Sequence, residues 1–329
     1  MNLHTNTELF KQAIQATSQY KGLKEIYIEK DYWVTLALKI IFTSQIKESV
    51  VFKGGTALSK VFNSIERFSE DIDLVLLRNE NDTANQLKKK LKIISNLIIQ
   101  ELPEVEISGV TRKRGMNRKT AHSYSKIFNG DYGQVRDCII LETSWLGNFE
   151  PFVMQKISSF IYEMMIESNQ KQLAIEYDML PFEVMVLEPE RTICEKIMSL
   201  IRFSYSENAI NDLNHKIRHI YDISRLMDVP NLLRFINSKE FDKMMLRVAK
   251  DDFNSFSQNI WLANHPKESL VFSNPTKLWK SLQKTYHEKF KLLVYGKFPE
   301  DKEILNSLNT LSKRIADIEW SSITMLFED

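Results

Sequence analysis

The chain has 329 residues, of which 43% are hydrophobic and 26% are charged, with only 9 glycines and 8 prolines. This composition is typical of a globular protein with a sizeable core, and it excludes collagen-like, low-complexity and disordered chains. The net charge is +1, so any contact with nucleic acid must come from a local patch.

The cysteines and the N-terminal residues bear on the cellular compartment. Cys138 and Cys194 lie far apart in apolar stretches, as expected for buried thiols under reducing conditions. No apolar segment follows a basic one at the N-terminus, so no secretory signal is expected. The most apolar helical run, residues 33–42, is short and contains Lys39, which is incompatible with a bilayer span. We therefore expect a cytoplasmic protein.

Helix and strand patterns alternate up to about residue 187. Apolar residues at helical spacing and short β-rich runs between turn residues distinguish the two. The predicted helices span 7–20, 28–45, 56–62 and 83–101, and the predicted strands span 50–52, 72–77, 105–112, 121–128, 135–145 and 182–187. The run Asn129-Gly130-Asp131-Tyr132-Gly133 predicts a hairpin between the strands at 121–128 and 135–145.

After Pro189, which suits the first position of a helix, almost every segment is predicted to be helical. These helices span 189–203, 211–228, 239–260, 276–290 and 302–317. The expected architecture is an α/β domain with a mixed sheet over 1–187, followed by a mainly helical domain over 188–329.

A glycine pair follows the first predicted strand. Gly54-Gly55 lies between the strand at 50–52 and the helix at 56–62. Without side chains to block the approach of a phosphate, the amides at such a turn can point toward an anion. Thr56 or Ser59 can add a hydroxyl donor. Alone, a Gly-Gly pair is more often a simple turn.

Two aspartates mark the start of the second strand. Asp71 and Asp73 are two positions apart, so both carboxylates face the same side. Such neighbours repel one another unless a cation lies between them, and all-oxygen ligands favour Mg²⁺. A lone Asp-x-Asp is more often a solvated edge. The glycine pair before it favours a metal-dependent phosphoryl or nucleotidyl transfer site.

A second metal ion usually needs a third carboxylate, and Glu142 is the best candidate. It ends an apolar strand, where a charge is costly unless it is paired or binds a metal. An ordinary structural role for Glu142 stays open because strand registers are difficult to predict from sequence.

These motifs resemble the AbiEii/AbiGii toxin family, whose fold is that of the DNA polymerase β-like nucleotidyltransferases. Its GGTAL-x-K and R-x-SEDIDL signature is matched at 54–58, Lys60, Arg67 and 69–74. Three further segments agree with family motifs, namely 29–35 (EKDYWVT), 191–196 (RTICEK) and 218–223 (RHIYDI). The resemblance covers residues 29–225.

The resemblance implies a role for each matched residue. Asp71 and Asp73 bind metal, with Glu142 as the added candidate, and the implied cofactor is Mg²⁺, two ions in all. Lys196 neutralises phosphate charge, and Asp222 is a further catalytic residue. The implied nucleotide-binding residues are Gly54, Gly55, Thr56, Ser59, Lys60, Arg67 and Ser69.

Several residues of these motifs also allow a structural role. Lys196 can be an exposed lysine on a helix where Arg191 and Glu195 form an i,i+4 pair. Asp222 lies at helical spacing from two arginines, Arg218 and Arg225, which makes a structural ion pair equally plausible. Arg67 can pair with Glu70. In the segment at 29–35, Lys30 and Asp31 can line the site, whereas Tyr32 and Trp33 suit the core.

The most concentrated positive run comprises Arg112, Lys113, Arg114, Arg118 and Lys119. Such runs are usually solvated loops, but a basic loop can also grip an RNA backbone. The run at 88–90, on the predicted helix over 83–101, is more typical of a solvated face.

By resemblance, the chain is expected to be a nucleotidyltransferase that moves NMP from an NTP to the 3′ end of tRNA. It would be the toxin of a toxin–antitoxin or abortive-infection pair, restrained by a cognate antitoxin. One alternative is a nucleotidyltransferase that modifies a protein or a small molecule. Another is a catalytically silent module that binds a nucleotide or a partner.

Overall fold

The computed structural model describes residues 1–79, 81–113, 115–133, 135–145, 150–256, 258–320 and 323. The chain divides into two compact units, each with its own buried apolar residues. The first unit contains 1–63 and 67–187, and the second contains 64–66 and 188–329.

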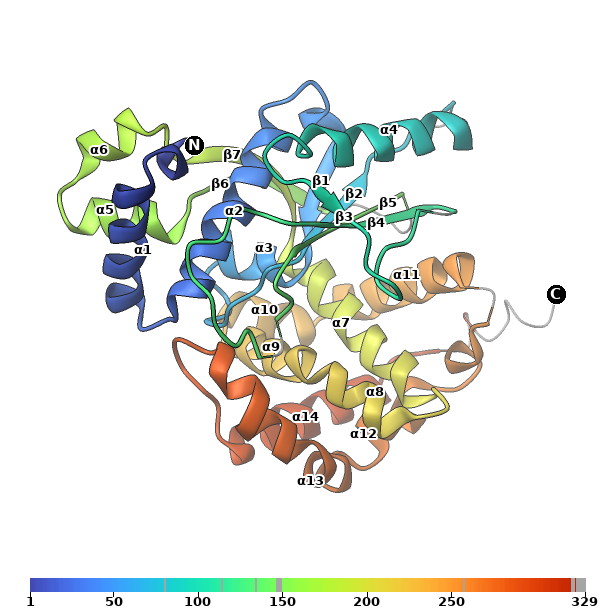
Figure 1. Cartoon of the computed structure of the whole chain (residues 1–329). Helices are drawn as coiled ribbons and strands as arrows, with labels where there is room; N and C mark the ends of the chain where they lie inside the picture. Colours follow the sequence, from blue (N-terminus) through green and yellow to red (C-terminus); the bar gives the residue numbers. More distant parts are fainter. Residues whose placement is uncertain are drawn as a thin grey trace. The chain divides into compact units, whose positions relative to one another are not determined.

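A mixed sheet organises the first unit (Figure 1). Its strands, in the order β3-β4-β5-β2-β1-β7-β6, are β1 (Val50–Lys53), β2 (Ile72–Leu76), β3 (Glu104–Val105), β4 (Asn117–His122), β5 (Ile139–Ser144), β6 (Phe152–Ile157) and β7 (Phe182–Leu187). Strand β1 runs antiparallel to β2 and parallel to β7, while β2 runs parallel to β5. The mixed sheet confirms the predicted α/β class.

The first unit also contains six α-helices in its described residues. They are α1 (Thr7–Lys21), α2 (Glu25–Phe42), α3 (Gly54–Lys60), α4 (Ala84–Leu97), α5 (Phe160–Glu167) and α6 (Lys171–Glu176). Helix α4 begins with a capping box between Thr83 and Gln86, which satisfies amides that the helix leaves open. Helix α2 is buried on nearly all sides, and both Tyr32 and Trp33 lie in the core as predicted.

The antiparallel pairing predicted between the strands at 121–128 and 135–145 is confirmed, but the tight turn predicted at 129–133 is wrong. Strands β4 and β5 pair antiparallel with His122 opposite Ile139, but the chain between them forms a long connection. This connection is held by buried charges of α2. The Glu29 carboxylate accepts from the amides of Ile127 and Phe128 at 2.6 and 3.1 Å, and Lys30 donates to a backbone carbonyl. These bonds satisfy backbone groups that a strand partner would otherwise satisfy.

The second unit is built from helices in the described ranges (Figure 1). They are α7 (Pro189–Ser204), α8 (Ala209–His215), α9 (Ile217–Met227), α10 (Pro230–Ile236), α11 (Lys239–Ser255), α12 (Leu270–Ser273), α13 (Pro275–Thr285) and α14 (Asp301–Ala316). The helix predicted over 211–228 is two helices that meet at Lys216. The mainly helical character of this part is as predicted.

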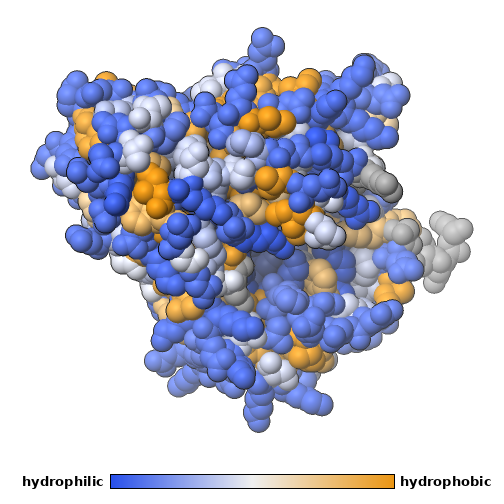
Figure 2. Space-filling model, viewed as in Figure 1, coloured by the Kyte–Doolittle hydropathy of each residue, from blue (hydrophilic) through white to orange (hydrophobic). Residues whose placement is uncertain are grey.

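The described helices include none that is both long and apolar enough to cross a membrane. Figure 2 shows polar residues over most of the visible face, with small, separate hydrophobic areas among them.

Candidate active site

The glycine pair joins β1 to α3, and both glycines have neighbours that exclude a side chain. Gly54 has φ +82°, and a Cβ atom there would overlap the Asp73 carboxylate. A Cβ on Gly55 would lie 2.6 Å from Arg67 Nη2 and 3.0 Å from Ser69 Oγ. The turn therefore depends on glycine for backbone conformation and for close approach.

A row of charged side chains crosses four neighbouring strands beside this turn. Lys53 on β1 is opposite Asp73 on β2, Asp73 is opposite Glu142 on β5, and Glu142 is opposite Lys119 on β4. Directly opposite residues project from the same face of a sheet. The row therefore reads lysine, aspartate, glutamate, lysine, with Asp71 just before β2. Lys53 was not predicted from the sequence, although its place immediately before Gly54 is a signal.

The two central carboxylates differ in their electrostatic environment. Burial, the neighbouring Glu142 and Asp71 raise the pKa of Asp73 to about 7. Desolvation acts to raise the pKa of Glu142, whose side chain is 34% exposed, but Lys119 at 2.9 Å and Asn117 at 3.0 Å hold this pKa below the usual value. Of these two carboxylates, Asp73 is therefore the one whose negative charge is less well compensated by its surroundings.

The chemistry of Asp71 and Asp73 fits a divalent cation. Both supply oxygen ligands, and a bound cation would relieve the repulsion that raises the pKa of Asp73. Among the described residues, no group of three His, Cys, Asp or Glu side chains is arranged to hold a metal ion. Glu142 accepts from Lys119 and Asn117, and its role as a third ligand stays a prediction.

The segment that leads to the aspartates is bonded to α3. Thr56 Oγ1 donates to the Asp71 carbonyl at 2.6 Å and to Ser69 Oγ at 3.0 Å. Ser59 Oγ donates to the Arg67 carbonyl at 3.4 Å, and Arg67 is itself buried. The structure thus brings four of the predicted nucleotide-binding residues together around the glycine turn, and each has a structural contact there.

Lys60 has a buried partner that sequence spacing did not indicate. Its Nζ lies 2.5 Å from Asp31 Oδ1, and the two side chains are only 3% and 4% exposed. The other Asp31 oxygen accepts from the Phe160 amide at 2.8 Å. This pair links α3 to α2 and gives Lys60 a structural role; its nucleotide contact stays a prediction.

In the second unit, Lys196 on α7 and Asp222 on α9 form a buried ion pair at 2.8 Å. Lys196 is 6% exposed, so the interpretation of Lys196 as an ordinary exposed lysine is wrong. The expected pair of Arg191 with Glu195 is present at 3.1 Å. Asp222 does have an ion-pair partner, but sequence spacing pointed to arginines of α9 and missed the lysine of another helix.

The basic run lies in the first unit, around the start of β4. Arg112 and Lys119 exchange backbone hydrogen bonds in an isolated antiparallel bridge. Lys113 and Arg118 both pair with Glu104. Arg114 lies outside the described residues. The RNA contact suggested for this run stays a prediction.

Comparisons with known proteins identify a family and one similar solved structure. A family model described as the nucleotidyl transferase AbiEii toxin of type IV toxin–antitoxin systems matches residues 36–306. Among solved structures, the chain is similar to MenT4, a nucleotidyltransferase toxin of Mycobacterium tuberculosis H37Rv. The identity is 14% and the TM-score 0.44, over 91% of this chain and 98% of that one. This likeness is too distant to support an argument. No curated protein matches the chain.

Proposed function

Because the chain belongs to the nucleotidyl transferase AbiEii toxin family of type IV toxin–antitoxin systems, we propose a Mg²⁺-dependent transfer of NMP from an NTP to tRNA. The proposed acceptor is the 3′ end of the tRNA, and a cognate antitoxin restrains the reaction. The observation that carries the proposal is the pair Asp71 and Asp73 beside a turn that only glycine fits.

Each part of the first unit has a role in this proposal. The backbone amides of the turn at Gly54-Gly55 bind the triphosphate in this proposal. Asp71 and Asp73 hold Mg²⁺, with Glu142 as a candidate third ligand. When bound, the metal stabilises charge on the reacting phosphate and activates the attacking hydroxyl. Lys53, opposite Asp73, and Lys119, bonded to Glu142, add positive charge beside these carboxylates.

In the second unit, the proposed catalytic residues are Lys196 and Asp222. A lysine neutralises phosphate charge best when its ammonium is held in place. The Asp222 carboxylate, fully buried and 2.8 Å from Lys196 Nζ, holds the ammonium in place. In this proposal Lys196 contacts phosphate, and Asp222 orients its ammonium.

A labelling experiment tests the proposal. The purified protein would be incubated with total tRNA, Mg²⁺ and each α-³²P-labelled NTP in turn. We expect one or more nucleotides to label tRNA, and we expect the label to disappear with Asp71→Ala/Asp73→Ala. Asp137→Ala is a matched control, because the Asp137 side chain is 67% exposed and pairs with the nearby Lys126.

The outcomes separate the candidate functions. Label on tRNA that is lost in the double variant but not in the control supports the proposal. Label on protein or on a small molecule would reject tRNA as the acceptor and keep the reaction class. Absence of label on every acceptor, with NTP still bound, would favour the catalytically silent module.

A further inference from the structure

The loop between α3 and β2 is divided between the two units. Residues 64–66 belong to the second unit, whereas Asn63 before them and Arg67 after them belong to the first. The same loop joins the glycine turn to Asp71. Three residues of the active-site loop are therefore held by the helical unit.

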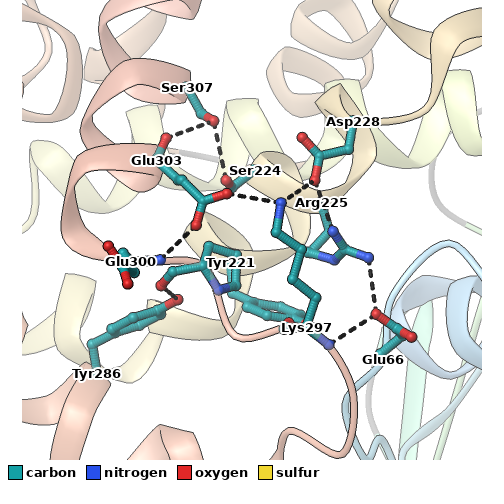
Figure 3. Close-up of polar contacts among 11 residues, drawn as sticks. Glu66, Tyr221, Ser224, Arg225, Asp228, Tyr286, Lys297, Glu300, Glu303 and Ser307 are labelled. Atoms are coloured by element: carbon teal, nitrogen blue, oxygen red, sulfur yellow. Dashed lines mark hydrogen bonds and ion pairs between the residues drawn. The ribbon is translucent and has the colours of Figure 1, made fainter.

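Glu66 makes the contacts that hold this segment (Figure 3). Its carbonyl oxygen accepts from the amides of Tyr295 and Gly296 at 3.0 and 3.3 Å. Its carboxylate accepts from Arg225 Nη2 at 2.9 Å and from the Lys297 amide at 3.0 Å. Both the backbone and the side chain of Glu66 are thus bound by the second unit.

Glu66 packs closely against Gly296. A Cβ atom on Gly296 would lie 2.5 Å from both Cβ and Oε1 of Glu66, so Glu66 packs where only glycine leaves room. Such a close approach is one of the few reasons for which a backbone position requires glycine. The segment that receives Glu66 therefore matches it in shape as well as in hydrogen bonds.

The groups that bind Glu66 are themselves fixed. Arg225 Nη1 pairs with Asp228 at 2.7 Å, and Lys297 Nζ pairs with Glu303 at 2.7 Å and with Asp228 at 3.3 Å (Figure 3). Tyr221 Oη donates to the Lys297 carbonyl at 3.3 Å. A donor that is already oriented loses less conformational entropy when it binds a carboxylate.

The opposite end of the loop is fixed in the first unit. Arg67 directly follows Glu66, and its Nη2 lies 2.6 Å from the position that a Cβ atom on Gly55 would take. Thr56 Oγ1 donates to the Asp71 carbonyl at 2.6 Å. The segment 67–71 is therefore held at one end by Thr56, which bonds to Asp71, and at the other end by the contacts of the preceding residue, Glu66. Release of the Glu66 end would allow Arg67 and Asp71 to move relative to the glycine turn.

We propose that Glu66 is a positioning residue, which acts by fixing residues 67–71 rather than by touching substrate. The kinetic test of this inference, by kcat and KM, rests on the proposed nucleotidyl transfer. The structural test, by hydrogen exchange, needs no substrate. The expected loss in rate follows from the sensitivity of transfer reactions to small errors in the placement of reacting groups.

The experiment compares Glu66→Ala, Glu66→Gln and Arg225→Ala with Glu303→Ala in the full chain. Glu303 is a matched control, because its side chain is 45% exposed against 41% for Glu66 and it bonds to Lys297 in the same cluster. Hydrogen exchange of residues 61–71 would be measured without ligands, and kcat and KM for the NTP would be measured with tRNA.

Glu66→Ala and Arg225→Ala should both speed exchange at 67–71 and lower kcat by roughly tenfold. Glu66→Gln keeps an acceptor oxygen and should recover part of both effects. The double variant Glu66→Ala/Arg225→Ala should be no worse than the more severe single variant, as expected when both changes break one interaction. Glu303→Ala should change neither measurement, because it removes a partner of Lys297 Nζ and leaves the Lys297 amide that binds Glu66.

Unchanged exchange at 67–71 in Glu66→Ala would overturn the inference, whatever the activity. Equal effects from Glu303→Ala would also overturn it, because the cluster would then only stabilise the helical unit. If no variant and no wild-type protein transfers nucleotide, the proposed function fails, and the exchange measurement still decides the role of Glu66.

Discussion

At the scale of single residues, Gly54 combines two requirements that are separate at the other glycines that the structure describes. Its φ is +82°, and its α-hydrogen faces the Asp73 carboxylate so closely that a methyl group would overlap it. Gly22, which ends α1, has φ +66° but no atom within 4 Å of the position of a Cβ. A comparison of Gly54 with Gly22 therefore separates the effect of a positive φ from the effect of close packing against Asp73.

Gly54→Ala should lower activity by roughly 100-fold or more, because it displaces Asp73 in addition to straining the backbone. Gly22→Ala should cost only about 1 kcal/mol of stability, as expected for alanine in a left-handed conformation, and leave activity unchanged. Urea unfolding and NMP-transfer rates measure the two effects. Equal losses of activity in both variants would show that the overlap with Asp73 is not important.

If Asp73 binds Mg²⁺ as proposed, the metal affinity should depend on pH. Burial and the adjacent carboxylates raise its pKa to about 7, so below pH 7 the metal-free protein holds a proton on this ligand. Because Mg²⁺ requires the carboxylate, the proton competes with it, and affinity falls as pH falls. Titration calorimetry should show roughly tenfold weaker Mg²⁺ binding at pH 6 than at pH 8. An affinity that is constant over this range would contradict the prediction.

At the scale of elements, the Asp31–Lys60 pair joins α2 to α3, the helix that begins at the glycine turn. Both side chains are almost fully buried. Lys60→Met would leave a buried carboxylate without its cation, and it should lower the free energy of unfolding by about 3 to 5 kcal/mol. Asp31→Asn/Lys60→Met should recover part of this loss, because no buried charge remains.

The matched control is Lys21→Met. Lys21 pairs with Glu163 at 2.5 Å in the same unit, but the side chains are 20% and 37% exposed. Solvent screens such a pair, so its loss should change stability by about 1 kcal/mol or less. Urea denaturation of the three variants gives the comparison. A similar loss for Lys21→Met and Lys60→Met would refute a special role of burial.

The elements themselves differ in how well they could be predicted. Strand β7 is predicted at its observed bounds, because its apolar run ends at the proline that begins α7. Strand β6 and helix α5 were not predicted. Strand β6 is half exposed and contains polar residues, so it has no clear alternation of apolar and polar residues, and its pairing with β7 determines its structure.

At the scale of the whole molecule, a net charge of +1 means that RNA binding must depend on a local surface. The exposed Arg112 and Lys113 are the test case, and the exposed Lys88 and Lys89 of α4 are the matched control. Arg112→Ala/Lys113→Ala should reduce the slope of log affinity for tRNA against log salt concentration by roughly 2. Lys88→Ala/Lys89→Ala should leave the slope unchanged, and a reversed result would assign RNA binding to α4.

The sequence by itself determined the fold class and the change from mixed α/β to helical structure, and it predicted the place of the candidate site. These features depend on local patterns: apolar periodicity, a glycine pair after a strand, and two aspartates two positions apart. Short-range geometry is the same in any tertiary context, so such patterns can be recognised without a structure.

The tertiary structure decided which charged residues are partners. Lys60 pairs with Asp31, Lys196 with Asp222, and Glu66 with Arg225, and each partner lies far away in sequence. Such pairs depend on helix packing and strand register, which spacing along one helix or strand does not contain. The physical reason is that burial removes water from a charge, and only the folded chain determines which opposite charge replaces it.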